Sequence, residues 1–133
     1  MKSRMIPVGL AALVLTGCAV PVETGQSRFL DHCAVCHGED AKGGRDAPLA
    51  KVWPKPPADL TTLAARNDGV FPTEYVMSTI DGYLRAKTHG TTMPQFGGLL
   101  DGPAMVWTDS NGVATPTPVA LVELAGYLES IQG

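Results

Sequence analysis

The chain has 133 residues, with 10 Lys or Arg, 13 Asp or Glu, three Cys and 6% aromatic residues. This length suits one domain and is too short for two ordinary hydrophobic cores. A hydrophobic content of 44% excludes an acidic disordered tail, and 15 Gly with 11 Pro favour a fold rich in loops. The net charge of -3, without a run of Lys or Arg, argues against a nucleic-acid binder.

The first residues have the pattern of a secretory signal peptide. Two basic residues precede the apolar stretch 5–15, which is shorter than the roughly 20 residues that cross a bilayer. The Leu-Thr-Gly-Cys motif that ends at Cys18 resembles the lipobox of bacterial lipoproteins, in which cleavage before the Cys exposes it to acylation. We therefore expect a lipoprotein signal peptide over residues 1–17 and a lipidated tether over residues 18–24. The alternative is an ordinary signal peptide with a nearby Cys.

A lipidated Cys18 predicts where the protein works. Several acyl chains on one residue give stable anchoring, so we expect the periplasmic side of a bacterial membrane. Ala19, where an inner-membrane lipoprotein of enteric bacteria has Asp, favours the outer membrane. All basic residues after residue 17 lie between Arg28 and Lys87, so one part of the surface should be more acidic than another. This uneven distribution of charge either steers a charged partner toward the protein or belongs to a solvated acidic face that has no partner.

The central motif of the chain is Cys33-Ala-Val-Cys36-His37. Two cysteines in an exported protein first suggest a disulfide, but Cys-x-x-Cys-His is the attachment signature of c-type haem. Thiols three residues apart lie on one helical face, so each can add across a haem vinyl group while the adjacent imidazole binds the iron. A thioredoxin-like pair needs no such His, and a zinc site would need a second ligand pair. The motif predicts one covalent haem c.

A second axial ligand decides whether the iron carries electrons or reacts. Met93 lies in a loop rich in Gly and Pro, which can fold tightly over a flat cofactor. Met77 lies in a predicted helix over residues 71–82 and is expected in the core, and Met105 precedes a β-like run. His89 is expected at the surface or in a loop hydrogen bond. We predict Met93 as the second axial ligand, and the other three are less favoured.

Together these motifs resemble those of small bacterial class I cytochromes c, over roughly residues 24–132. The resemblance implies an all-α fold of three to five helices around one covalent haem, in a domain over residues 25–133. In that family the first and last helices cross, and a small residue permits their close approach. The positions that match this crossing are Gly25, Phe29, Leu124 and Tyr127.

Two further stretches carry the resemblance. Pro48 matches the family proline whose carbonyl accepts the N–H of the proximal imidazole, which tunes the basicity of that ligand. Residues 55–61 are similar to a stretch that leads into a short middle helix in many bacterial members.

The segment Leu99–Thr117 departs from the family pattern, because it is longer than a minimal member needs. A turn signal over residues 109–112 predicts a small β-hairpin that carries Trp107. This hairpin is either a docking or haem-shielding flap or, as we favour, a surface excursion that covers the edge of the core. Thr117 is expected as the N-cap of the last helix, with Pro118 in its first position.

The ligands and the resemblance together predict an electron carrier rather than an enzyme. Two protein ligands, His37 and Met93, leave no vacant position on the iron for a substrate. We expect redox partner proteins, either a membrane oxidoreductase or a soluble periplasmic carrier, and a membrane contact through the lipid anchor. Two alternatives stay open: a haem subunit of a larger periplasmic dehydrogenase, and a peroxidase-like or ligand-binding haem protein in which Met93 leaves the iron.

Overall fold

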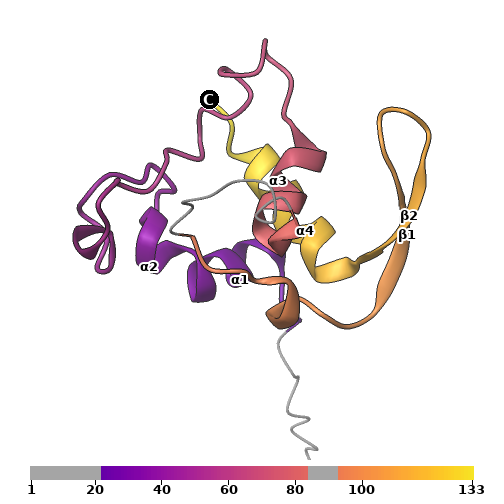
Figure 1. Cartoon of the computed structure of the whole chain (residues 1–133), viewed down its shortest axis with the longest axis horizontal. Coiled ribbons are helices and arrows are strands. Elements are labelled where there is room, and N and C mark those ends of the chain that lie inside the picture. The colour runs from indigo at the N-terminus through magenta and orange to yellow at the C-terminus, as the bar shows by residue number, and fades with distance from the viewer. Residues whose placement is uncertain (1–21, 84–92) are drawn as a thin grey trace, which may run out of the picture.

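The computed structural model describes residues 22–83 and 93–133, so Cys18 and His89 lie outside the described residues. The described chain forms α-helices α1 (Gly25–His32), α2 (Ala34–His37), α3 (Thr73–Asp81) and α4 (Val119–Ser130), 3-10 helices η1 (Ala50–Val52) and η3 (Gly97–Leu99), and strands β1 (Ala104–Thr108) and β2 (Ala114–Pro118). The two strands form an antiparallel hairpin that projects away from the helices (Figure 1). No helix within the described ranges is long and apolar enough to span a membrane.

The first two helices meet at Cys33, which ends α1 and precedes α2. The start of α1 is fixed by a capping box, because Ser27 N–H donates to Thr24 Oγ1 at 3.1 Å while Thr24 N–H donates to Ser27 Oγ at 2.8 Å. Helix α2 ends at Gly38, whose φ of 78° lies in the region that glycine adopts without strain. The Cys-x-x-Cys-His motif therefore begins at the junction of the two helices, at Cys33, and continues through α2 to His37.

The predicted contact between the first and last helices is confirmed. A Cβ atom added to Gly25 would lie 2.1 Å from the Glu123 carbonyl oxygen, so only glycine permits this approach of α1 to α4. The rings of Phe29 and Tyr127 pack with their centroids 5.4 Å apart, and Leu124 is fully buried beside them. Figure 1 shows α1 lying across α4. This contact is the centre of the hydrophobic core.

Helix α3 packs on the same core and agrees with the helix predicted over residues 71–82. It runs from Thr73 to Asp81, and its C-cap Gly82 has a left-handed φ of 99°. Met77 is buried in the core cluster with Ile80, as expected for a packing residue. Helices α1, α3 and α4 thus supply most of the core, which Ala34 of α2 and the loop residues Ala41, Phe71 and Leu100 complete.

The predicted hairpin is confirmed, with Trp107 of β1 opposite Thr115 of β2. Its turn is closed by Asp109, whose Oδ1 accepts from the N–H of Asn111 at 2.9 Å and of Val113 at 2.7 Å. Trp107 is half-buried and packs against the core cluster, as expected for an excursion that covers the core edge.

The predicted start of the last helix is wrong by one residue. Pro118 is the N-cap of α4, and Thr117 is still part of β2, where its hydroxyl donates to the Thr115 carbonyl at 3.1 Å. Because β2 runs directly into the helix, the extended backbone of the strand continues through Pro118 and the helix begins at Val119.

Residues 61–69 also differ from the family-based expectation of a middle helix. They form a succession of turns, in which one i to i−4 bond, from Arg66 N–H to the Thr62 carbonyl at 3.1 Å, stands beside an i to i−3 and an i to i−5 bond that both end on the Ala64 carbonyl. This segment therefore depends on bonds to other parts of the chain for its shape.

Candidate functional site

The two cysteines of the motif are free thiols at the junction of α1 and α2, and both are half-buried. Burial raises the pKa of the Cys33 thiol to about 11, with a further contribution from the neighbouring Cys36. Thiols that act as redox nucleophiles or zinc ligands are instead held as thiolates by a lowered pKa. A neutral thiol fits addition of S and H across a vinyl double bond, which is the reaction that forms a haem thioether.

The described residues offer no competing site for a bare metal ion. Within residues 22–83 and 93–133, no group of three or more His, Cys, Asp or Glu side chains is arranged to hold one. A zinc site, which needs three or four such ligands together, therefore has no support in this part of the chain.

The His37 imidazole is held by a backbone carbonyl. Its Nδ1 lies 3.0 Å from the Ala58 carbonyl oxygen, and because a carbonyl can only accept, Nδ1 carries the proton and donates. Burial lowers the pKa of His37 and outweighs this hydrogen bond, which acts in the opposite direction. The ring is therefore neutral near pH 7, with the lone pair of Nε2 available to a metal, as in histidine-ligated metal sites in general.

The prediction that Pro48 supplies this carbonyl is wrong. The oxygen beside Nδ1 belongs to Ala58, and Pro48 is exposed. Its neighbours pack elsewhere: Ala47 is buried, and Leu49 N–H donates to the Val35 carbonyl at 3.0 Å. This contact holds the proline segment against the side of α2.

Two glycines explain why the Ala58 carbonyl reaches the imidazole. Gly43 N–H donates to the His37 carbonyl at 2.7 Å, and Gly44 N–H donates to the Pro57 carbonyl at 3.1 Å. A Cβ atom at Gly43 would lie only 2.4 Å from the Pro57 oxygen and 2.5 Å from the Ala58 oxygen. Because Gly43 has a φ of 68° and no side chain, the two backbone segments can lie in direct contact.

Met93 lies where a loop meets the core. It is half-buried and packs against the same hydrophobic cluster as Cys33. The following residues are fixed to the end of α3, since Phe96 N–H donates to the Ile80 carbonyl at 3.0 Å and the backbone of Gly82 lies against the Gln95 side chain.

The other two methionines are placed less suitably for an axial ligand. Met77 is used in the core of α3, and Met105 is exposed on β1 of the hairpin. Since the hairpin projects away from the helices in Figure 1, the part of the chain that carries Met105 leads away from α2.

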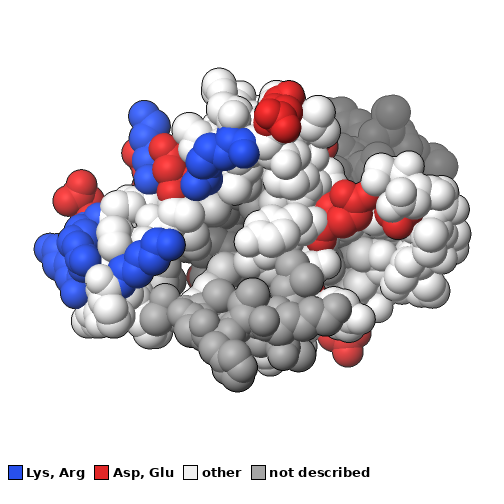
Figure 2. Space-filling view, turned by 45° about the horizontal axis from the view of Figure 1, so that its top comes forward, with Lys and Arg blue, Asp and Glu red and all other residues white. Residues whose placement is uncertain are grey.

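Exposed basic residues gather on the segment between α2 and α3. Lys42, Arg45, Lys51 and Lys55 are all exposed there, and the Arg45 guanidinium donates to the carbonyls of residues 53 and 54 at 3.1 and 3.2 Å. Figure 2 shows Lys and Arg side chains concentrated toward one end of the face in view. Residues 93–133 contain no Lys or Arg, so the predicted charge asymmetry is present on the folded chain.

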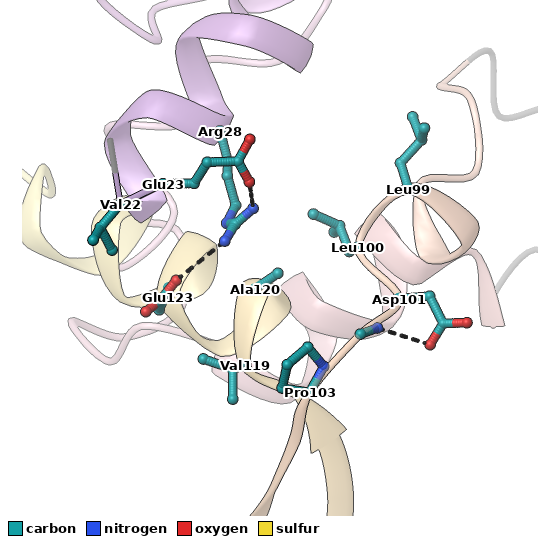
Figure 3. Close-up of a pocket in the computed structure, with 11 residues that line it drawn as sticks. Val22, Glu23, Arg28, Leu99, Leu100, Asp101, Pro103, Val119, Ala120 and Glu123 are labelled. Carbon is teal, nitrogen blue, oxygen red and sulfur yellow. Dashed lines mark hydrogen bonds and ion pairs between the residues drawn. The ribbon is translucent and has the colours of Figure 1, made fainter. Parts of the chain in front are cut away.

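A surface pocket of about 410 Å³ lies away from this motif, between α1, α4 and the segment that leads into β1 (Figure 3). Its one cation, Arg28, forms ion pairs with Glu23 and Glu123, while the buried Arg28 Nε has no hydrogen-bond partner among the described residues. Because three carboxylates, those of Glu23, Asp101 and Glu123, line the pocket beside this single guanidinium, the pocket offers no free cation to an anionic ligand.

Sequence reasoning missed the role of Ala58. A backbone carbonyl has no residue signature, and the one usable signal was the pair Gly43-Gly44, which indicates close approach of another backbone segment.

The comparisons with known proteins agree with the motif. No curated protein and no solved structure shows a significant match to the chain. The family model described as Cytochrome c matches residues 22–109, which include Cys33, Cys36, His37 and Met93. Members of this family bind haem c covalently and typically carry electrons. With two free thiols and an oriented imidazole in the Cys-x-x-Cys-His motif, and with this match over most of its length, the chain belongs to the cytochrome c family.

Proposed function

We propose that the protein transfers electrons in the periplasm through a single haem c with His37 and Met93 as axial ligands. The haem, when bound, supplies an iron that alternates between two valences. Cys33 and Cys36 would hold its edge through two thioethers, and His37 would bind the iron through Nε2. The observation that carries the proposal is the hydrogen bond from His37 Nδ1 to the Ala58 carbonyl, because it fixes the tautomer that a metal-binding imidazole requires.

Met93 is the second ligand in this proposal. Its loop is anchored to the end of α3, and its side chain packs on the same hydrophobic cluster as Cys33. A thioether ligand favours the ferrous state and raises the reduction potential relative to a second imidazole. With His37 and Met93 as its two protein ligands, a bound iron would change valence with little rearrangement.

The experiment compares Met93→Ala with Met77→Ala and Met105→Ala as controls. The oxidised wild-type protein should show the weak far-red charge-transfer band of an iron–methionine bond. Met93→Ala should lose this band and gain carbon monoxide binding, whereas both controls should keep it. Loss of the band in a control alone would mean that another methionine binds the iron. Rapid carbon monoxide binding by the wild type would favour the ligand-binding or peroxidase-like alternative.

The location and partners form the second part of the proposal. The lipobox-like motif at Cys18 supports a lipid anchor, and the short tether over residues 18–24 would hold the domain beside the membrane. Seven residues extend at most about 25 Å, so partners are a membrane oxidoreductase or a soluble carrier that diffuses to the surface. The exposed basic residues on the segment after α2 suit a partner with an acidic docking face.

A further inference from the structure

The side chain of Gln132 joins the end of α4 to the turn segment that follows Ala58. Its Oε1 accepts from Ala64 N–H at 2.9 Å, and its Nε2 donates to the Leu60 carbonyl at 2.8 Å and to the Leu128 carbonyl at 2.6 Å. An amide side chain has two N–H donors and one oxygen, so both donors and the acceptor are used. All these groups are half-buried or buried, where an unmade hydrogen bond is costly.

A backbone bond beside Gln132 reinforces the connection. Gly133 N–H donates to the Thr61 carbonyl at 3.0 Å. Figure 1 shows the end marked C next to the segment that rises after residue 60. Because residues 61–69 lack a regular helix, the bonds from Gln132 and Gly133 are a main restraint on where the first part of this segment lies.

The restrained segment leads directly to the imidazole. Leu60 is two residues from Ala58, and its N–H donates to the Ala41 carbonyl at 2.8 Å. Its carbonyl is bound by Gln132, so both backbone groups of Leu60 are fixed. A shift of Leu60 would move the Ala58 carbonyl, which accepts from His37 Nδ1. On the other side, Gly44 fixes the Pro57 carbonyl.

We infer that Gln132 is a positioning residue for the proximal imidazole, and that it acts through Leu60 and the Ala58 carbonyl. The inference rests on the proposed function, since it takes His37 as the ligand of the haem iron. A firm hydrogen bond to Nδ1–H increases the electron donation of the imidazole and so stabilises the ferric iron. Loosening Gln132 should therefore weaken that bond and raise the reduction potential.

The test uses Gln132→Met, which keeps the length of the side chain and removes all three hydrogen bonds. Gln132→Glu is the second variant, because it keeps the acceptor for Ala64 and loses the donors to Leu60 and Leu128. Ser130→Ala is the matched control: its hydroxyl donates at 2.7 Å to the Tyr127 carbonyl of its own helix and does not reach the turn segment. Haem content of the wild type is measured first.

Three quantities are measured on each holoprotein: hydrogen exchange of the Ala64 and Leu60 amides, exchange of the His37 Nδ1 proton in the reduced state, and the reduction potential. Gln132→Met should accelerate exchange at all three protons and raise the ratio of reduced to oxidised protein severalfold at a fixed ambient potential. A tenfold rise corresponds to about 59 mV for a one-electron couple. Gln132→Glu should change Leu60 and His37 more than Ala64, and Ser130→Ala should change none.

The outcomes separate this inference from the proposed function. Faster amide exchange with an unchanged Nδ1 proton and potential would overturn the inference, because Gln132 would then stabilise only the fold. Unchanged amide exchange in both Gln132 variants would overturn it as well. If Gln132→Met fails to fold, Gln132→Glu decides between these results by the same three measurements. Absence of covalent haem from the wild type would instead refute the proposed function, before any variant is compared.

Discussion

Replacing Gly25 by Ala tests the contact between α1 and α4 with the smallest possible change. The added Cβ atom would lie 2.1 Å from the Glu123 carbonyl oxygen, 2.6 Å from its carbon and 3.0 Å from the Tyr127 Cβ. Ordinary contacts of a Cβ atom begin near 3.4 Å, so the two helices must separate by more than 1 Å at this point. Two of the three atoms are backbone, so no side-chain rotation relieves the overlap.

The magnitude follows from two opposing effects. Overpacking of a well-packed core costs about 1–3 kcal/mol. Because the overlap is with backbone atoms, the upper part of this range applies, about 2–3 kcal/mol. Replacing Gly by Ala in the middle of a helix returns about 0.5–1 kcal/mol, and Gly25 is the first residue of α1, so this gain is an upper limit and at least about 1–2.5 kcal/mol of the free energy of unfolding is lost. In a domain of this size such a loss lowers the unfolding midpoint by about 4–15 °C. The separation also loosens the packing of Phe29 on Tyr127, so Gly25→Leu should be worse.

The assay is thermal unfolding of the holoprotein, followed by circular dichroism. Gly126→Ala is the matched control, because Gly126 lies in α4, the helix that Gly25 contacts, and no atom outside its own neighbourhood comes within 4 Å of an added Cβ. The control should unfold at the same temperature as the wild type or slightly higher, since Ala favours the helix. An unchanged midpoint in Gly25→Ala, with haem still attached, would refute the contact between the two helices.

Two further predictions concern the hairpin and the tether. Glu74 Oε1 accepts from Ser110 N–H at 3.0 Å and from its hydroxyl at 2.9 Å, and these bonds lower the pKa of Glu74. The contact between Glu74 and the hairpin should therefore be complete above the ordinary pKa of Glu, and it should be lost as the pH falls through the lowered pKa of Glu74. The chemical shift of the Ser110 amide, followed by NMR against pH, measures this loss. Glu74→Gln should abolish the pH dependence, and a pH-dependent shift that persists in this variant would contradict the assignment to Glu74. Cys18→Ser with a cleavable signal peptide should release a soluble protein of unchanged spectrum, whereas retention in salt-washed membranes would exclude a lipid anchor at Cys18.

The parts of the structure that the sequence predicted share a physical reason: each is set by local chemistry or by a close packing need. The hairpin follows from the Asp109 turn, which is built by side-chain bonds within five residues. The helix over Thr73–Asp81 is marked by Pro72 before it and Gly82 after it. Gly25 was assigned to the crossing through the family resemblance, and the structure gives the physical reason, because a Cβ atom there would overlap the Glu123 backbone.

The parts that the sequence did not predict depend on backbone groups and long-range contacts. The carbonyl beside His37 comes from Ala58, 21 residues away, and any residue type could supply it. Gln132 reaches Leu60 across 72 residues, and a single polar side chain near the end of a helix gives no sign of its partner. The missed N-cap of α4 is a smaller error of the same kind, because the strand pairing of Thr117 overrides its local capping preference.

The most direct test of the account is the intact mass of the purified, denatured protein. One haem should be bound covalently to each chain, so the mass should exceed that of the polypeptide by one haem, and the pigment should resist acid-acetone extraction. The single variants Cys33→Ser and Cys36→Ser should each lose most of the holoprotein. A mass equal to that of the bare polypeptide, with pigment that extracts freely from the wild type, would contradict covalent attachment at Cys33 and Cys36.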